Sequence, residues 1–405
     1  LNIENMNIAF VEQKMLPGIG TYYDNISRML AKQGNRIWLM SSTPKDADDY
    51  GKDGVRFVHV PSCRSAVPFT AQIRWDWRVA RLLREIEVEH GLDVVEFSSY
   101  LPEGLVYVYS RRQAAVCIRV HEWKNRVGLR RIWRDTADAI REILCWLQMA
   151  RADLILPVSA ALHDDCIPYM GSDRQARKIF TVRPGYDLDL LAPTPDPPPA
   201  YRALEGRRII LFVGRITEAK GTYNLIDAFR NEIAPRFGDT ALVLVGVPEN
   251  SDRLRSALSG AASNVIHLDN VQSQELPAFY SHAYVFVGPS RQEGFGAVFV
   301  EALACGVPVI SVAKGGPLEI VMPEETGILC PDNSPSSIAE ALERLLSDRD
   351  LRDRMAGAAR ASVVDRFGLD RVASELMEKY REVVARRDRR RGHFRRPAPM
   401  ASRIE

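Results

Sequence analysis

The sequence contains no hydrophobic run long enough to cross a membrane. No stretch approaches the roughly 18–20 consecutive apolar residues that a spanning helix needs. A secretory leader is not expected either, because residues 1–5 carry no basic side chain and the apolar run at residues 8–11 is too short. We therefore expect any contact with a membrane to be peripheral.

The cysteines form no recognisable pair or cluster. There is no C-x-x-C motif and no regular spacing, and most of them stand beside apolar residues, as buried free thiols do. This pattern does not suggest a disulfide framework and predicts a protein of the reducing cytoplasm. The six cysteines are at positions 63, 117, 145, 166, 305 and 330.

The net charge of +2 conceals two basic islands. Residues 111–134 carry eight Arg or Lys and one Glu, and residues 385–396 carry seven Arg and one Asp. The rest of the chain is therefore acidic, with a net charge of −11. Neither island contains a known nucleic-acid-binding module, so we expect no nucleic-acid partner.

Short apolar runs alternate with helical patterns along most of the chain. This alternation predicts an α/β fold with parallel, doubly wound sheets. The expected strands cover residues 7–11, 36–40, 93–97, 116–120, 154–158, 208–213, 241–245, 285–287 and 307–311. The expected helices cover residues 22–33, 75–90, 132–149, 223–229, 273–281, 297–304, 336–346, 351–367 and 370–385.

A proline-rich stretch divides the chain into two parts. Residues 184–200 contain six prolines and no helical period, which indicates a linker that is semi-rigid where the prolines are dense. At 405 residues, the chain is long enough for two domains. The predicted units are an N-terminal domain (1–183), a linker (184–204), a C-terminal domain (205–368), a final helix (369–385) and a disordered basic tail (386–405).

The segment P-S-R-Q-E-G-F-G-A-V-F-V-E-A-L-A-C-G-V-P-V, residues 289–309, is the most informative. Glu301 lies within an otherwise apolar helix, so its carboxylate should be buried and should need a partner. Glu293 precedes it in a glycine-rich turn, and the N-terminus of the helix that follows favours anions. Two acids around an anion site suit a phosphorylated, polyhydroxylated ligand. The alternative is a core helix in which Glu301 pairs with an arginine and Glu293 lies in solvent.

A second motif follows the strand at residues 208–213. Gly214 ends this strand, and Arg215 and Lys220 lie in the loop before the next helix. Ligands of doubly wound folds gather at the carboxyl ends of strands. Two cations at such an end can hold a diphosphate, although solvated loop cations are an equal alternative.

Three further features lie near predicted strand ends. Gly18 and Gly20 form a loop compatible with phosphate, but the third glycine of a dinucleotide fingerprint is missing. The strand that follows does not end in the acidic residue that would bind the ribose of NAD, so a dehydrogenase is disfavoured. His121 directly follows the strand at residues 116–120, and V-A-K-G-G-P-L-E-I-V at residues 312–321 allows the backbone to approach a ligand closely. A structural histidine and an ordinary turn are the alternatives.

Together these segments resemble the GT-B glycosyltransferases, specifically the large retaining family 4. The motifs G-R…K-G, E-G-F-G…E-A-L-A-C-G-V-P-V and G-G-P-L-E-I-V occur in the family's order and spacing. The resemblance covers essentially the whole chain and is strongest over residues 205–365. It implies two Rossmann-like domains with a cleft between them, and a nucleoside-diphosphate sugar as donor, with UDP favoured over GDP.

The resemblance also implies roles for single residues. Arg215 and Lys220 would bind the donor diphosphate, and Gly18, Gly20 and Gly214 would lie near it. Glu293 would hold sugar hydroxyls with help from the backbone of Gly294, Phe295 and Gly296, Glu301 would bind the ribose, and His121 would lie beside the transferred sugar. The catalytic set is therefore His121, Glu293, Arg215 and Lys220. No metal and no cofactor are expected, and the acceptor would be a small molecule, a saccharide or a lipid-linked compound.

Some positions depart from the family pattern. Val247 and Asp269 differ from the usual residues near the base-binding region, so the nucleotide base stays open, and Arg183-Pro184-Gly185 differs from the usual domain junction. Residues 6–10 resemble the start of the family's chains, so residues 1–5 are expected to be an extension or a non-standard start. An epimerase of the same fold and an inactive nucleotide-sugar-binding protein are the alternative functions. The basic island at 111–134, with Trp123 and Trp133, is either a solvated loop or a face that meets an anionic membrane.

Overall fold

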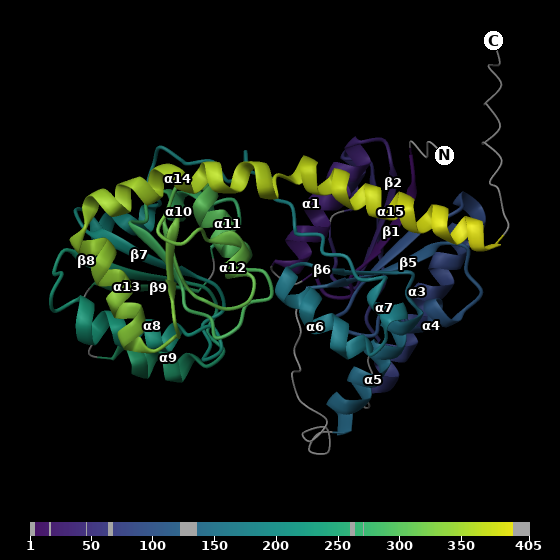
Figure 1. Cartoon of the computed structure of the whole chain (residues 1–405), viewed down its shortest axis with the longest axis horizontal. Coiled ribbons are helices and arrows are strands. Elements are labelled where there is room, and N and C mark those ends of the chain that lie inside the picture. Colours follow the sequence, from purple (N-terminus) through teal and green to yellow (C-terminus); the bar gives the residue numbers. More distant parts are fainter. Residues whose placement is uncertain are drawn as a thin grey trace, which may run out of the picture.

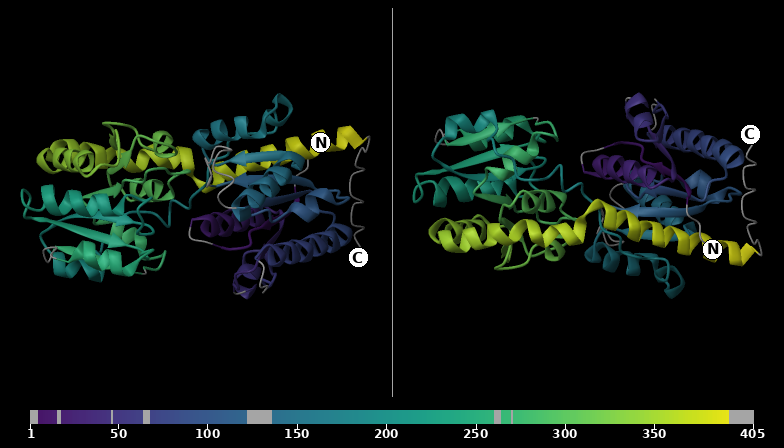
Figure 2. Two further views of the ribbon diagram at one scale, coloured as in Figure 1. Left: turned by 90° about the horizontal axis from the view of Figure 1, so that it is seen from below. Right: turned by 90° about the horizontal axis from the view of Figure 1, so that it is seen from above.

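The protein consists of two halves, each built around a parallel sheet (Figures 1 and 2). The computed structural model describes residues 5–15, 18–45, 47–63, 68–121, 136–259, 264–269 and 271–391. Each sheet has six strands, all paired in parallel, with helices on both faces. The predicted fold class, two doubly wound Rossmann-like domains, is confirmed.

The N-terminal sheet has the strand order β3-β2-β1-β4-β5-β6. The order reverses between β1 and β4, and in open sheets of this kind ligands bind outside the carboxyl ends of the strands at such a point. The strands are β1 (Asn7–Val11), β2 (Arg36–Ser41), β3 (Val55–His59), β4 (Val94–Ser98), β5 (Ala115–Val120) and β6 (Leu154–Pro157).

The C-terminal sheet repeats this topology, with the order β12-β11-β10-β7-β8-β9. Its reversal lies between β7 and β10, the two strands that precede the predicted donor motifs. The strands are β7 (Arg208–Val213), β8 (Thr240–Val245), β9 (Val265–Leu268), β10 (Val285–Gly288), β11 (Val309–Val312) and β12 (Gly327–Cys330).

The helices cover both faces of each sheet (Figure 1). In the N-terminal half they are α1 (Ile19–Lys32), α2 (Ala47–Lys52), α3 (Pro68–His90), α4 (Leu105–Tyr109), α5 (Thr136–Arg151), α6 (Ala160–Met170) and α7 (Asp173–Ala176). In the C-terminal half they are α8 (Thr222–Ala228), α9 (Ser251–Leu258), α10 (Leu276–Ser281), α11 (Ala297–Ala304), α12 (Pro317–Ile320), α13 (Pro335–Ser347) and α14 (Arg349–Phe367), followed by α15 (Leu369–Arg391).

The sequence patterns missed three of the four edge strands, β3, β9 and β12, and predicted only β6. Of the three, β3 and β9 have partly exposed side chains. A half-exposed strand of four or five residues has no continuous apolar run to reveal it. On α5, the apolar side chain of Ile140 is 48% exposed and does not face the core.

The linker packs against the C-terminal half rather than hanging free. Tyr186 and Leu188 belong to the same buried cluster as Phe295 and Phe367. The guanidinium of Arg360 on α14 donates to the carbonyl oxygens of Leu188 and Leu191 in the linker. These contacts fix where the chain leaves one half for the other.

Helix α15 crosses from the C-terminal half to the N-terminal half (Figure 1, yellow). Its apolar side chains, among them Leu376 and Tyr380, lie in the buried cluster of the N-terminal sheet. It continues through Arg391, so residues 386–391 are helical and not part of a disordered tail.

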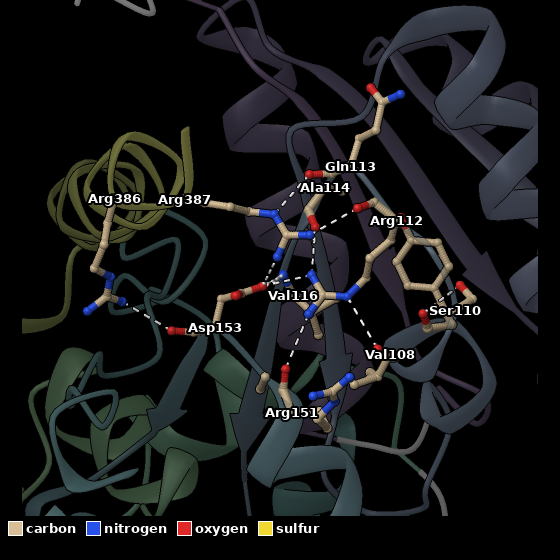
Figure 3. A network of polar contacts seen from close by, with 12 residues as sticks. Val108, Ser110, Arg112, Gln113, Ala114, Val116, Arg151, Asp153, Arg386 and Arg387 are labelled. Atoms are coloured by element: carbon tan, nitrogen blue, oxygen red, sulfur yellow. Dashed lines mark hydrogen bonds and ion pairs between the residues drawn. The ribbon is translucent and has the colours of Figure 1, made fainter. Parts of the chain in front are cut away.

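A carboxylate anchors the end of α15 to the N-terminal half (Figure 3). Oδ2 of Asp153 lies 2.7 Å from NH1 of both Arg112 and Arg387 and also accepts from the backbone of Val116. Arg386 donates to the backbone oxygen of Asp153. Three cations of the two basic islands are therefore engaged with the body of the protein.

Candidate active site

The loops after β7 and β10 lie against each other. The backbone nitrogen of Arg291 donates to the oxygen of Ala219 at 3.0 Å. Gly221, with φ of 69°, directly precedes α8, and a Cβ there would lie 2.1 Å from the oxygen of Pro289. Only glycine permits this contact, which brings the G-R…K-G and E-G-F-G motifs together.

Lys220 and Glu293 form an ion pair at this junction. Nζ of Lys220 lies 2.7 Å from Oε2 of Glu293, and the side chains are 29% and 16% exposed. The cation predicted to bind phosphate and the acid predicted to bind sugar are therefore neighbours. Partial shielding from water strengthens their attraction relative to an exposed pair.

Arg215 follows Gly214 at the end of β7 and is exposed. Among the described residues it has no hydrogen bond or ion pair, so its guanidinium is available to an anion. Gly214 itself has a φ of 145°. A Cβ at Gly246 would lie only 2.0 Å from the backbone oxygen of Gly214.

Glu301 finds its partner in a tyrosine and not in an arginine. The hydroxyl of Tyr280 on α10 donates to Oε2 of Glu301 at 2.7 Å. Burial raises the pKa of Glu301, and the bond from Tyr280 opposes that rise. Glu301 as a residue is nevertheless only partly buried.

Tyr186 of the linker lies close enough to both acids of the motif to feel their charges. Burial and then the charges of Glu301 and Glu293 raise its pKa well above the ordinary value. Its ring stacks on Phe295, with centroids 6.3 Å apart and an interplanar angle of 12°. Sequence reasoning assigned this residue to the linker and missed its place beside the site.

Gly294 is one of the points at which the two halves touch next to the site. A Cβ at Gly294 would lie 2.5 Å from the backbone oxygen of His121. Ser159, which caps α6, donates its hydroxyl to the oxygen of Gly294 at 2.6 Å. His121 of the N-terminal half and Glu293 of the C-terminal half are thereby held on adjoining segments.

His121 is surrounded by aromatic rings and lies near a cation. The rings of Tyr22 and Tyr23 on α1 are 5.3 and 5.7 Å from the imidazole. Burial, and then the charge of Arg119, lower the pKa of His121 well below its ordinary value. The imidazole is therefore neutral, and Nε2 is buried with no partner among the described residues.

The remaining glycines shape the loops around these side chains. Gly18, with φ of 87°, directly precedes α1, and Gly20 lies against the backbone of Met15. Gly296, with φ of 101°, directly precedes α11. Cβ atoms at Gly315 and Gly316 would collide with the backbone oxygens of Glu293 and Phe295, so the G-G-P-L-E segment supports the E-G-F-G turn.

A buried ion pair lies beneath His121. Arg119 is fully buried on β5, and its Nε lies 3.0 Å from Oε1 of Glu96 on β4. Tyr380 of α15 donates to the other oxygen of Glu96 at 2.6 Å. Sequence reasoning missed this network, although a charged residue inside the apolar strand V-C-I-R-V is the same kind of signal as Glu301.

Comparison with known proteins identifies relatives over nearly the whole chain. The family described as "Glycosyl transferases group 1" matches residues 197–362, and "Glycosyltransferase Family 4" matches residues 17–216. The chain is 30% identical over 312 residues to a GDP-mannose-dependent alpha-(1-6)-phosphatidylinositol monomannoside mannosyltransferase of Mycolicibacterium smegmatis, covering 71% of this chain and 76% of that one.

Two further similarities extend the comparison. A D-inositol 3-phosphate glycosyltransferase of Xylanimonas cellulosilytica is 28% identical over 400 residues, covering 92% of this chain and 93% of its own. The crystal structure of Anabaena HepE in complex with UDP and glucose has a TM-score of 0.76 and 17% identity, covering 93% of this chain and all of that one. At that identity the structural likeness establishes the fold.

Proposed function

The chain belongs to the group 1 glycosyltransferases of family 4, and we propose that it transfers a hexose-type sugar from a nucleoside diphosphate to an acceptor hydroxyl with retention of the anomeric configuration. The observation that carries this proposal is the ion pair between Lys220 and Glu293, 2.7 Å long, on the segment that touches His121. A cation suited to phosphate, an acid suited to sugar hydroxyls and a facing histidine on adjoining segments support this proposal.

The proposed catalysis is electrostatic. Negative charge grows on the diphosphate as it leaves, and Arg215, Lys220 and the N-terminus of α11 would stabilise it. Such preorganised groups are commonly the largest contribution to rate, and removing one typically costs about 2.7–4 kcal/mol.

Among the described residues of the candidate site, no acid or histidine is available as a general base, and this supports retention. Glu293 is paired with Lys220, and Glu301 accepts from Tyr280. His121 is a poor proton acceptor, because burial and the charge of Arg119 both disfavour the imidazolium form. The leaving phosphate is then the group best suited to receive the acceptor's proton.

We propose UDP as the donor nucleotide in preference to GDP. HepE binds UDP, whereas the mycobacterial relative is GDP-mannose-dependent, so the two comparisons differ. Both named relatives act on inositol-containing acceptors, which favours a polyol or glycolipid acceptor and a role in cell-surface glycan, glycolipid or secondary-metabolite synthesis.

A thermal-shift screen of nucleotides and nucleotide sugars tests the donor. A ligand at 100 times its dissociation constant should stabilise the protein by roughly 2.7 kcal/mol. Stabilisation by GDP and not by UDP would overturn the choice of base.

Analysis of the product tests the reaction. Anomeric coupling constants in its NMR spectrum should show an α linkage from an α-linked donor, and His121→Ala should lower kcat more than donor affinity. A β linkage would contradict retention. An epimerised donor without transfer would favour the epimerase alternative, and binding without turnover would favour an inactive protein.

We also propose that the N-terminal half meets an anionic membrane. Within the described residues, no helix is both long and apolar enough to span a bilayer. On α5, however, Ile140, Ile143 and Trp146 are 48%, 56% and 39% exposed and lie three residues apart. Of the preceding basic island, residues 122–134 lie outside the described residues, while Arg112 and Arg119 are buried in ion pairs.

Co-sedimentation with vesicles tests this surface. Binding should increase with anionic lipid and fall with salt, because each cation near such a surface contributes about 1 kcal/mol. Trp146→Ser should weaken binding, and Trp77→Ser, which changes a 59% exposed tryptophan on α3, serves as the matched control. Equal, salt-independent partitioning to anionic and neutral vesicles would contradict the proposal.

A further inference from the structure

Glu319 connects the two halves of the chain beside the candidate site. It lies on α12 in the C-terminal half, and its Oε1 accepts a hydrogen bond from the backbone nitrogen of Ala160, 2.5 Å away. Its Oε2 lies 2.7 Å from NH2 and 2.9 Å from Nε of Arg183. One carboxylate therefore joins two separate segments of the opposite half.

Both partners of Glu319 are firmly part of the N-terminal half. Ala160 is the first residue of α6, an eleven-residue helix whose N-terminus attracts a negative charge. Arg183 follows Val182, whose nitrogen donates to Pro157 of β6 and whose oxygen accepts from the buried Arg119. Glu319 can therefore move away from these partners only if one half of the protein moves relative to the other.

The other end of the same segment supports the site. The nitrogen of Gly316 donates to the oxygen of Glu293 at 3.0 Å, and Gly315 packs against that oxygen. Arg366 of α14 binds the backbone oxygen of Glu319 and so holds α12 to the C-terminal half. Residues 315–319 thus touch Glu293 at one end and the N-terminal half at the other.

Partial shielding makes these contacts stronger than an ordinary surface ion pair. Glu319 is 14% exposed and Arg183 is 40% exposed. Next to them, Leu162 is buried in the same cluster as Phe295, so apolar contact accompanies the polar one. Water that entered on separation would have to hydrate both the charges and this apolar surface.

We propose that Glu319 is a positioning residue, whose ion pair with Arg183 and hydrogen bond from Ala160 latch the two halves in the arrangement that sets Glu293 and Gly294 against His121. The kinetic part of this proposal rests on the proposed transferase function. The structural part, that Glu319 controls the separation of the halves, does not.

The test uses the full-length chain with Glu319→Gln, Arg183→Gln and the double variant. The matched control is Glu324→Gln, which removes an exposed glutamate whose ion pair with Arg344 stays within the C-terminal half. Hydrogen exchange followed by mass spectrometry reports on the amide of Ala160, and solution X-ray scattering reports on the radius of gyration. Both latch variants should exchange faster at the start of α6 and become more extended, and the control should do neither.

Kinetics then separate positioning from a purely structural role. We expect kcat to fall about 10- to 100-fold in each latch variant, as a displacement near 1 Å can cause. The affinity for UDP or GDP should stay within about twofold, because the side chains proposed to bind the nucleotide, Arg215, Lys220 and Glu301, all lie in the C-terminal half. A fall in kcat without a matching loss of nucleotide affinity indicates that an interaction made only in the transition state was lost. The double variant should lose no more kcat than either single variant, because each single variant already removes the ion pair between Glu319 and Arg183.

Two results would overturn the latch. The first is unchanged exchange at α6 and unchanged scattering in both single variants. The second is a loss of nucleotide affinity that matches the loss of kcat, which would make Glu319 a local part of the donor site. If the wild-type protein transfers no sugar, the proposed function fails, but exchange and scattering still decide whether the latch exists. If Glu319→Gln does not fold, Arg183→Gln tests the same contact from the other side.

Discussion

Nζ of Lys220 donates to Oε2 of Glu293 across 2.7 Å, although 73 positions separate the two residues in the sequence. The cation is therefore already paired with an acid before any diphosphate reaches it. A bound diphosphate must share Lys220 with Glu293 or displace it, so the two residues have opposite effects on nucleotide affinity.

This relationship predicts different outcomes for three variants. Lys220→Ala and Arg215→Ala should each lose UDP affinity and transfer, with about 2.7–4 kcal/mol lost in the transition state. Glu293→Gln should bind UDP at least as tightly as the wild type, because it frees Lys220, and yet should transfer poorly. Calorimetry measures the UDP affinity of the three variants, and initial rates measure their transfer activity. Undiminished nucleotide affinity in Lys220→Ala and Arg215→Ala would remove the diphosphate assignment.

Tyr280→Phe should weaken nucleotide binding without disrupting the fold. The hydroxyl of Tyr280 donates to Glu301, and its loss leaves that buried carboxylate with one fewer partner. A hydrogen bond to a charged group contributes about 1.5–3 kcal/mol, so the affinity should fall by roughly one to two orders of magnitude. Comparing UDP with free uracil in calorimetry locates the effect: an equal loss for uracil would argue against contact between Glu301 and the ribose.

Gly294→Ala should lower kcat strongly, because the new Cβ would lie 2.5 Å from the oxygen of His121. Relief of that contact requires the two halves to separate. Gly357→Ala on α14 is the matched control, since a Cβ there meets nothing within 4 Å. We expect the control to keep full activity and to gain a little stability, as alanine favours helix. Normal activity in Gly294→Ala would mean that the contact is not needed for catalysis.

The stability of the protein should depend on the protonation of Asp76. Burial raises the pKa of this acid from 3.8 to about 8, while the backbone nitrogen of Val106 donates to its Oδ2 at 2.9 Å. The folded state then keeps a proton that the unfolded chain releases near pH 4. The stabilising contribution is complete below that pH and is lost as the pH rises through about 8.

Asp76→Asn removes this titration and keeps an acceptor for Val106. The free energy of unfolding of the variant, relative to the wild type, should rise between pH 5 and pH 8.5 in urea titrations. Asp252→Asn on α9, whose side chain is 88% exposed, should run parallel to the wild type. Parallel curves for Asp76→Asn as well would show that Asp76 is ionised in the folded protein.

Activity should survive removal of divalent ions. In the proposed mechanism, Arg215 and Lys220 would supply the positive charge that a metal would otherwise bring to the diphosphate. Initial rates in excess EDTA should therefore match those without it. Loss of activity in EDTA that Mg²⁺ or Mn²⁺ restores would contradict the electrostatic mechanism.

The sequence alone was sufficient for the features that local patterns encode. Helix α11 was predicted at the bounds that the structure has, Ala297–Ala304, because a continuous apolar segment with glycines on either side marks a helix and its ends. The alternation of strands and helices was enough for the two doubly wound sheets. The need of Glu301 for a partner was also evident, since a charge on an apolar helix cannot remain unpaired without cost.

Only the tertiary structure could decide which residues meet. The partner of Glu301 is Tyr280 on another helix, and Glu319 reaches Arg183, 136 positions away. The sequence also could not show which charges are exposed. Arg112 was counted in the basic island, but in the structure it is buried against Asp153. A local pattern states which face of an element is buried. The partner across that face depends on how separate elements pack, and no stretch of sequence around either residue records it.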